Sequence, residues 1–278
     1  MFGFLNVYKP KGKTSHDVVA ILRRVTKVRQ IGHTGTLDPF AEGVLPICIG
    51  KATRLIEYLG DDKAYVGMVQ LGASTTTYDI EGDVVKSSDL SVTLEQIEAA
   101  LEGFRGEIEQ MPPIYSAIKV GGKKLYEYAR NGEEVEIKER DIEIMMIELI
   151  DFSNNEIVFD VKCSKGTYIR SLCVDIAKKL GYPGHMSHLE RRQAGRFLIT
   201  DCITLEQLEN DDYSLHSIDD ALCGFPQLKL DDPTPVYHGK QIKSDLTGQV
   251  AIYDNQNRLL AIYESTGQGY LKNVRGLW

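Results

Sequence analysis

Residues 31–46 combine side chains that can do chemistry with a backbone that only a loop can accommodate. The segment contains three glycines, two prolines, His33 and Asp38. Glycine and proline at this density predict a loop, and Pro39 favours an extended backbone at Asp38. A carboxylate held in this way is a candidate nucleophile or general base. An aspartate that caps its own backbone in a turn gives the same pattern, so the segment alone leaves both interpretations open.

A second candidate group lies at Tyr168 and Arg170, where a predicted strand passes into a helix. The apolar residues that follow have helical spacing: Ile169, Leu172, Cys173, Ile176, Ala177 and Leu180. They predict an amphipathic helix that ends at Gly181. Arg170 then falls in the first turn, off the buried stripe, where a positive charge opposes the helix dipole. This placement indicates an anionic partner for Arg170.

Residues 110–132 are basic, contain the glycine pair Gly121-Gly122 and are interleaved with tyrosine. This composition is typical of a mobile element that grips RNA through phosphate contacts and stacking. A solvated loop followed by a helix has the same composition, and the residues alone favour that simpler interpretation.

Several classes of protein are disfavoured by the composition. The five cysteines are scattered and never form a C-x-x-C pair, which indicates reduced thiols in a cytoplasmic protein. His185 and His188 have a spacing that can ligate a metal, but no further Cys/His cluster accompanies them. No apolar run approaches the roughly 20 residues that span a bilayer, and the N-terminus lacks a signal-peptide pattern. We therefore expect no metal, no membrane and a cytoplasmic location.

The net charge of −8 is unevenly distributed along the chain. Residues 1–54 carry nine basic and three acidic residues, and residues 161–196 carry eight and two. Acidic residues dominate 81–110 and 201–232 instead. Such segregation can place a basic, phosphate-binding face on an acidic protein, or it can disperse when the chain folds.

The elements that position these groups can be predicted from apolar periodicity and capping signals. A strand is expected at 3–8, followed by a helix that Thr14 or Ser15 caps. Thr93 opens a second helix with Leu94, Ile97, Leu101 and Phe104 as its core face. Further strands are predicted at 63–72, 78–85, 135–139, 142–151, 157–163, 249–253 and 259–263. The last two belong to about fifty residues of short strands, which suggest a small β-barrel-like domain.

Taken together, the motifs resemble the TruB family, the tRNA pseudouridine-55 synthases. The resemblance rests first on Gly32-His33-Thr34-Gly35-Thr36-Leu37-Asp38-Pro39, followed by Gly50-Lys51-Ala52-Thr53-Arg54. It continues through Lys9-Pro10, the Pro112-Pro113 and Tyr126-x-x-Ala129-Arg130 segments, Gly166-x-Tyr168-x-Arg170, and His185-x-x-x-Leu189-x-Arg191. These motifs cover essentially the whole chain in matching order.

This resemblance implies an α+β pseudouridine-synthase fold. Its central sheet would be mixed, mostly antiparallel and flanked by helices. Residues 1–222 would form the catalytic domain, with an RNA-clamping insertion at about 110–140. Residues 223–278 would form a small β-barrel-like PUA-type domain that binds RNA.

The resemblance also implies roles for particular residues. Asp38 would be the catalytic carboxylate and Arg170 its ion-pair partner. Tyr65 would stack on the target base, Tyr168 would lie beside the reacting carbon, and Leu172 and Leu189 would form an apolar wall. His33 would fill the stack vacated by the flipped base, or hydrogen-bond the loop backbone.

RNA contacts are expected from basic residues in several motifs: Lys9, Lys119, Lys123, Lys124, Arg130 and Arg191. Glu190-Arg191-Arg192 stands where many family members have Leu-Arg-Arg, so the arginine assignment is uncertain by one position. Arg191 would lie near an RNA phosphate or the active site. The expected partner is the tRNA T stem-loop. We expect no cofactor or metal, and a monomer.

Three alternatives stay open from the sequence. A retaining glycosidase or nucleoside hydrolase would need a second carboxyl about 5 Å from Asp38, for which Glu42 is the close candidate in sequence. A non-catalytic RNA-binding or RNA-folding protein is the second alternative. The third is a guide-RNA-dependent relative, although the compact C-terminus favours the stand-alone bacterial type.

Overall fold

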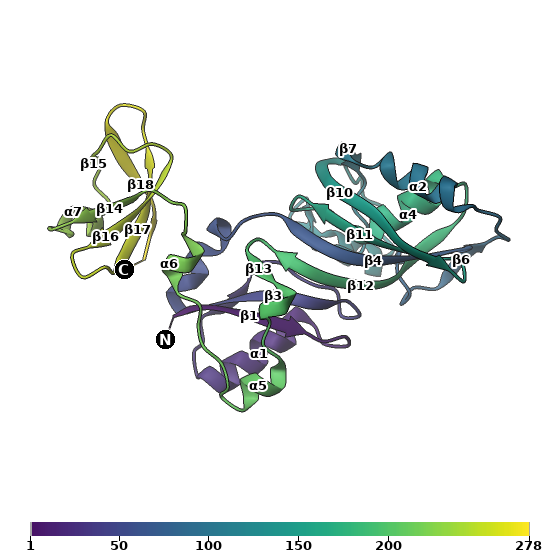
Figure 1. Cartoon of the computed structure of the whole chain (residues 1–278), viewed down its shortest axis with the longest axis horizontal. Coiled ribbons are helices and arrows are strands. Elements are labelled where there is room, and N and C mark those ends of the chain that lie inside the picture. The colour runs from purple at the N-terminus through teal and green to yellow at the C-terminus, as the bar shows by residue number, and fades with distance from the viewer. Residues whose placement is uncertain (1, 278) are drawn as a thin grey trace.

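The computed structural model describes residues 2–277, apart from the side chains of residues 220 and 221, and two sheets dominate it (Figure 1). The larger sheet has nine strands, in the order β1-β3-β12-β4-β11-β10-β7, with β2 added beside β3 and β13 beside β12. Its strands are β1 (Gly3–Lys9), β2 (Ile31–His33), β3 (Glu42–Ile49), β4 (Lys63–Leu71), β7 (Gly106–Gln110), β10 (Arg140–Ser153), β11 (Glu156–Cys163), β12 (Gly184–Ala194) and β13 (Phe197–Leu198).

The larger sheet is mixed because β3 and β12 pair in parallel, whereas its other strand pairs are antiparallel. The predicted α+β fold with a mostly antiparallel sheet is confirmed. At the parallel junction Gly43 lies opposite Arg191 and has a φ of +104°. A Cβ on Gly43 would lie 2.2 Å from the Arg191 carbonyl oxygen. Glycine at this position therefore allows the two strands to meet.

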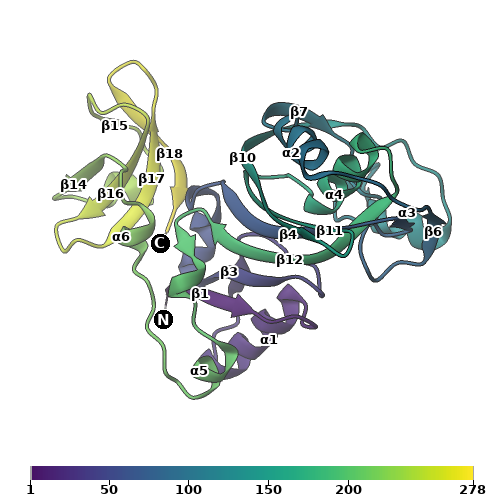
Figure 2. The same ribbon diagram turned by 45° about the vertical axis from the view of Figure 1, so that its right-hand side comes forward.

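Two helices cover one face of the β12-β4-β11-β10 part of the sheet, as Figures 1 and 2 show. They are α2 (Leu94–Glu102) and α4 (Ile169–Lys179). The apolar stripe of α4, including Leu172 and Ile176, packs with Val69 and Phe159 in the main core. On the β1-β3 side lie α1 (Ser15–Thr26), the 3-10 helix η1 (Gly50–Tyr58) and α5 (Leu205–Glu209). Thr14 caps α1 through a capping box with Asp17.

Short elements extend from this framework. The hairpin β5 (Ala73–Thr75)–β6 (Val84–Ser87) follows β4. The insertion after β7 carries β8 (Lys119–Val120), β9 (Lys123–Lys124) and α3 (Leu125–Asn131). The 3-10 helix η2 (Ile199–Asp201) and α6 (Ile218–Ala221) lie in the segment that leads to the second sheet.

The C-terminal residues form a five-stranded half-barrel sheet with the order β14-β16-β17-β18-β15. Its elements are β14 (Gln227–Leu230), α7 (Thr234–Tyr237), β15 (Ile242–Lys243), β16 (Gln249–Asp254), β17 (Leu259–Ser265) and β18 (Tyr270–Gly276). Ala251 and Ile262 on this sheet share a core cluster with Leu55 of η1 and Phe4 of β1. This core joins residues on both sides of the domain boundary that was predicted between residues 222 and 223. The division into two domains at that point therefore stays a prediction.

Three local predictions are wrong. Residues 76–83 form a turn between β5 and β6, whereas a strand was predicted over 78–85. Residues 135–139, also predicted to be a strand, do not form one. Leu94 is 52% exposed and does not belong to the core face of α2. Within residues 2–277 we find no helix that is both long enough and apolar enough to cross a membrane.

Gly43→Ala tests the junction between β3 and β12. An alanine at a positive φ costs roughly 1–2 kcal/mol by itself, and the clash with the Arg191 carbonyl raises the expected loss of unfolding free energy above about 3 kcal/mol. Gly12→Ala is the control, because Gly12 has a φ of +84° but a Cβ added there would meet no other atom within 4 Å. Chemical denaturation should show the larger loss for Gly43→Ala, and equal losses would contradict the steric argument.

Candidate active site

The loop between β2 and β3 is fixed by contacts on both sides of Asp38. Leu37 N–H donates to Ser15 Oγ over 2.9 Å, and Ser15 Oγ donates to the Leu37 carbonyl over 3.2 Å. The Gly12 N–H donates to the Pro39 carbonyl over 2.8 Å. Leu37 and Phe40 are anchored in the main core. These contacts hold the backbone of Asp38 in one conformation.

Lys9 contacts this loop and is fully buried. Its ammonium group donates to the carbonyls of Pro10, Lys13 and Pro39, over 3.1, 2.5 and 3.2 Å. Burial lowers the pKa of Lys9 to about 8, although the negative charges of Asp38 and Glu42 oppose this shift. A fully buried lysine cannot reach an RNA phosphate, so the structure contradicts the predicted RNA contact of Lys9.

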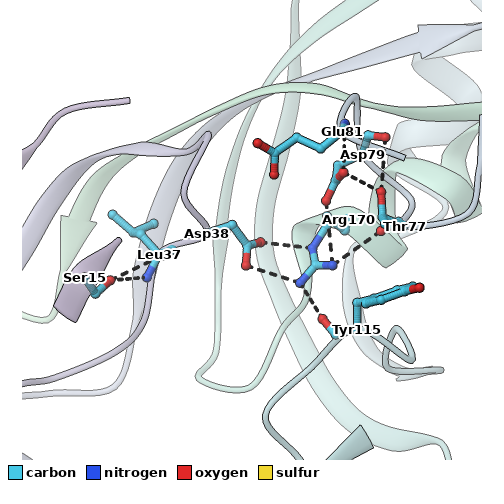
Figure 3. Close-up of polar contacts among 8 residues, drawn as sticks. All are labelled: Ser15, Leu37, Asp38, Thr77, Asp79, Glu81, Tyr115 and Arg170. Carbon is cyan, nitrogen blue, oxygen red and sulfur yellow. Dashed lines mark hydrogen bonds and ion pairs between the residues drawn. The ribbon is translucent and has the colours of Figure 1, made fainter. Parts of the chain in front are cut away.

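The Asp38 carboxylate faces the guanidinium of Arg170 (Figure 3). Arg170 Nε lies 2.9 Å from Asp38 Oδ2, and Arg170 Nη2 lies 3.3 Å from Asp38 Oδ1. This two-point geometry gives a strong, directional ion pair. Arg170 therefore holds the Asp38 carboxylate. This differs from the alternative interpretation of the sequence, in which Asp38 caps its own backbone in a turn. Arg170 is 6% exposed, so its predicted place off the buried stripe of α4 is wrong.

Arg170 also binds a second carboxylate, Asp79, which sequence reasoning missed. Arg170 Nη1 lies 3.7 Å from Asp79 Oδ2 and donates to the Thr77 carbonyl over 3.3 Å. Asp79 Oδ1 accepts from Thr77 Oγ1 and from the Glu81 N–H. The turn that presents Asp79 contains Tyr78 at a φ of +66°. A positive φ at tyrosine is a signal that only the folded backbone reveals.

The ionisation of Asp38 reflects opposing influences. Burial raises the pKa of Asp38 above its ordinary value. The Arg170 guanidinium lowers this pKa, the Asp79 charge raises it, and the Lys9 charge lowers it. Arg170 therefore does the most to keep a half-buried carboxylate ionised.

Asp38 and Arg170 lie on the wall of a cavity of about 500 Å³, which is within the usual range for small-ligand sites. Its aromatic lining includes Tyr65, Tyr115, Tyr126 and Tyr168. Its apolar lining includes Leu37, Ile169, Met186 and Leu189. Leu189 lies where the resemblance places it, but Leu172 is fully buried in the main core and does not line this cavity. Ile169 and Met186, which sequence reasoning did not select, occupy that wall.

Arg191 is 1% exposed and ties β12 to the loop between β2 and β3. Its Nε donates to the Val44 carbonyl over 2.7 Å and its Nη2 to the Gly35 carbonyl over 3.0 Å. It lines the cavity together with Tyr65. Arg192 is exposed and pairs with Glu190 instead. Of the two neighbouring arginines, Arg191 is therefore the one that lines the cavity, and its burial does not fit a surface contact with RNA phosphate.

Burial raises the pKa of the Tyr65 phenol, so the ring meets the cavity in its neutral form. Lys63, two residues earlier on β4, lines the same cavity. Burial lowers the pKa of Lys63, and the Arg191 charge lowers it further. Sequence reasoning did not select Lys63.

His33 is half-buried and packs edge-on against His16, with ring centroids 5.7 Å apart. Burial lowers the pKa of His33, and the charges of His16 and Arg191 add to this effect. His33 Nδ1 is buried and has no hydrogen-bond partner among the described residues. The backbone hydrogen bond that the sequence left open for His33 is not made by this nitrogen.

The insertion after β7 is tied to the start of α4. Gln110 Nε2 donates to the Tyr168 carbonyl over 3.1 Å, and the Tyr168 N–H donates to Gln110 Oε1 over 2.8 Å. Ser171 Oγ donates to the Met111 carbonyl over 2.7 Å. Arg170 Nη2 donates to the Tyr115 carbonyl over 3.0 Å (Figure 3). The insertion and Asp38 therefore share a partner in Arg170.

The basic residues selected in the insertion gather around two tyrosines. Lys123 Nζ lies 4.5 Å from the Tyr128 ring centroid, and Lys124 Nζ and the Arg130 guanidinium each lie 5.3 Å from the Tyr126 ring centroid. Lys123 also pairs with Glu133 over 2.6 Å. Lys119 and Arg130 are exposed. Because Tyr126 lines the cavity, Lys124 and Arg130 lie close to the cavity wall.

The competing carboxyl, Glu42, does not line the cavity; its Oε1 lies 3.7 Å from His188 Nε2. Asp79 is the nearer second carboxyl, but Arg170, Thr77 and Glu81 already bind it. A retaining-glycosidase pair is therefore not supported. Within the described part of the chain, no group of three or more His, Cys, Asp or Glu residues is arranged to hold a metal ion.

The sheet, the loop and the cavity define the class of pseudouridylate synthases, and comparison of the chain with known families places it within that class. Residues 23–169 match the N-terminal domain of the TruB family of pseudouridylate synthases. Residues 170–225 match the tRNA pseudouridylate synthase B C-terminal domain. The chain belongs to the TruB family, and it is an isomerase.

Curated relatives agree with this assignment. The chain is 46% identical over 284 residues to tRNA pseudouridine synthase B of Bacillus thuringiensis (strain Al Hakam), covering 95% of this chain and 92% of the relative. It is 44% identical over 270 residues to tRNA pseudouridine synthase B of Caldanaerobacter subterraneus subsp. tengcongensis, with the same coverage.

Solved structures share the fold over the full chain. A chain of a crystal structure of a Cbf5-Nop10-Gar1 complex has a TM-score of 0.75 and 26% identity, and the match covers 100% of this chain and 85% of that one. A chain of an H/ACA RNP bound to a substrate RNA containing 2′-deoxyuridine has a TM-score of 0.72 and 24% identity, with 100% and 85% coverage. At 24% identity, the similarity to the second structure shows only that the two chains share a fold.

Lys9→Met tests the structural role of the buried ammonium group. We expect a loss of about 1–3 kcal/mol in unfolding free energy, because carbonyl groups lose their donor. Between pH 8 and 10.5 the unfolded chain holds more protons on Lys9 than the native chain, so Lys9 becomes more stabilising as pH rises. Denaturation of both proteins from pH 7 to pH 10 should show the difference between them widening.

Lys11→Met is the control for this comparison, because Lys11 is exposed on the same loop. It should leave the unfolding free energy within about 0.5 kcal/mol of wild type. A Lys9→Met protein as stable as wild type at every pH would contradict the structural role.

Proposed function

We propose that this protein converts the T-loop uridine at position 55 of tRNA to pseudouridine, with Asp38 as the catalytic carboxylate. The observation that carries the proposal is the Asp38–Arg170 ion pair on the wall of a nucleotide-sized cavity. The relatives named tRNA pseudouridine synthase B, 46% identical to this chain, support tRNA as the substrate.

The reaction breaks the bond between C1′ and N1 of the uridine, turns the uracil, and joins C1′ to C5. C5 then loses its proton and N1, no longer bonded to the sugar, takes one up, so atoms and charge balance without an oxidant, reductant or metal. An ionised carboxylate can assist by attacking C1′, by attacking C6, or by removing a 2′ proton. Asp38 is ionised and aligned for any of these by Arg170.

The cavity supplies the remaining requirements. Tyr65 would stack on the uracil, and Tyr168 would lie beside the reacting carbon. Leu189, with Ile169 and Met186, would exclude water from the separated base and sugar. The reaction rearranges bonds within one nucleotide, so the proposal requires no further role for the side chains that line the cavity.

A uridine inside a folded T loop must leave its stack to reach Asp38, at a cost of a few kcal/mol. His33 is our candidate to fill the vacated space, because its neutral ring borders the catalytic loop. Lys119, Lys123, Lys124 and Arg130 would hold RNA phosphates beside the cavity opening, where Tyr126 brings the insertion to the site. The half-barrel sheet would add further RNA contacts.

The proposed enzyme acts alone, as a cytoplasmic monomer without cofactor. The 44–46% identity to bacterial tRNA pseudouridine synthase B, against 26% for the chain from the Cbf5-Nop10-Gar1 complex, favours this over guide-RNA-dependent action. The non-catalytic alternative would not explain why the Asp38 carboxylate is aligned at the wall of the cavity.

Asp38→Asn tests the catalytic carboxylate. Tritium release from C5-tritiated uridine in an unmodified tRNA transcript should fall to background, because the amide is neither nucleophile nor base. Affinity for the same transcript should stay within a few-fold of wild type, since the side chain keeps its size.

Glu42→Gln is the matched control, because it removes the other carboxyl that the sequence offered, and it should retain wild-type release. Appreciable release by Asp38→Asn would rule out the role of Asp38. Tight binding without release by the wild-type protein would favour the RNA-folding alternative.

The pH dependence tests the influence of Arg170. Since Arg170 lowers the pKa of Asp38, Arg170→Lys should move the acidic limb of the single-turnover rate upward by about one pH unit. Asp79→Asn removes a charge that raises the same pKa, so it should move the limb downward. Two shifts in the same direction would contradict the assignment.

A further inference from the structure

We propose that the hydroxyl group of Ser116 binds the extruded nucleotide, by donating a hydrogen bond to one of its oxygen acceptors. The proposal rests on the proposed function, because it concerns the RNA that enters the Asp38 cavity. Ser116 lies in the insertion and lines that cavity together with Asp38, Tyr65 and Leu189.

Ser116 Oγ has no hydrogen-bond partner among the described residues, although it is buried. The residue as a whole is 5% exposed. A buried hydroxyl without a partner costs about 1–3 kcal/mol, and such groups are rare in folded proteins. The free protein therefore carries a donor and acceptor at the cavity wall that nothing in the described part of the chain satisfies.

The backbone of Ser116 is held on both sides, so its position does not depend on the side chain. Its N–H donates to the Ile114 carbonyl over 3.0 Å, and its carbonyl accepts from the Tyr126 N–H over 3.1 Å. The carbonyl of the preceding residue, Tyr115, accepts from Arg170 Nη2 over 3.0 Å. The hydroxyl can then meet a ligand by rotating about χ1 between staggered positions, without moving the loop that supports it.

A nucleotide brings suitable acceptors to this wall. The uracil carbonyls, the ribose oxygens and the phosphate oxygens can each accept from a hydroxyl group. Because less than 1 Å² of Oγ is accessible to solvent in this conformation, the hydroxyl meets an acceptor in the cavity after rotation about χ1. A hydrogen bond made only when RNA fills the cavity would remove the penalty of the free state and favour the bound nucleotide.

Ser116→Ala separates this role from a structural one. The variant loses no side-chain hydrogen bond within the described structure, so its Tm should equal or exceed that of wild type. Its kcat/KM for an unmodified tRNA transcript should fall about 3- to 10-fold, which corresponds to one neutral hydrogen bond. Ser187→Ala is the matched control, because Ser187 Oγ donates to Glu156. It should lower Tm and leave kcat/KM unchanged.

Modified transcripts identify the acceptor. The target uridine is replaced by 2-thiouridine or 4-thiouridine, or its 5′ phosphate by a methylphosphonate. The difference in kcat/KM between wild type and Ser116→Ala should disappear with the one modified transcript in which the acceptor of the Ser116 hydroxyl is weakened. A difference that persists with all three changes assigns the acceptor to the ribose.

Two results would overturn the inference. One is an unchanged kcat/KM for Ser116→Ala, and the other is a fall in Tm of several degrees, which would reveal a partner within the protein. Turnover by wild type is measured in the same assay, so a failure of the proposed function would appear there first and is distinguishable from a failure of this inference.

Discussion

The candidate active site depends on one guanidinium group. Arg170 brings together three segments that are far apart in the sequence: the loop between β2 and β3 through Asp38, the turn at 76–83 through Asp79, and the insertion through the Tyr115 carbonyl. A planar group with five fixed donors suits this task, whereas a lysine ammonium could not span the same three directions. Because Arg170 is buried, its charge must be matched, and two carboxylates together with main-chain carbonyls match it.

Patterns in the sequence predicted the framework of this site well. The helical spacing after Ile169 predicted α4, and the density of glycine and proline predicted the Asp38 loop. Asp79 was missed for a physical reason. Thr75, Thr76 and Thr77 favour an extended strand, but Tyr78 takes a positive φ and turns Asp79 inward. The ion pair of Asp79 with Arg170 and the hydrogen bond from the Met186 N–H to the Tyr78 carbonyl help to hold that conformation, and both join residues far apart in the sequence.

The burial of two basic residues could not be predicted from the sequence either. A lysine or arginine is usually exposed. From the family motifs Lys9 was predicted to contact RNA, and Arg191 to lie near an RNA phosphate or the active site. Each is buried because carbonyl groups from separate loops converge on it: Pro39 and Lys13 on Lys9, Val44 and Gly35 on Arg191. Such convergence has no local sequence signal. Lys119 and Arg130 are exposed, and their contact with RNA stays a prediction.

The insertion and the chemistry of Asp38 are not independent. Arg170 Nη2 binds the Tyr115 carbonyl and Asp38 Oδ1 at once, so a displacement of Tyr115 changes the donor that Asp38 faces. The pKa of Asp38 is raised by burial and lowered chiefly by Arg170, and these opposing influences are sensitive to small changes in distance because the site has a low dielectric. The insertion, which we propose to hold RNA, therefore also helps to set the charge of Asp38, which we propose to be the catalytic carboxylate. If both proposals hold, Arg170 alone links binding to catalysis.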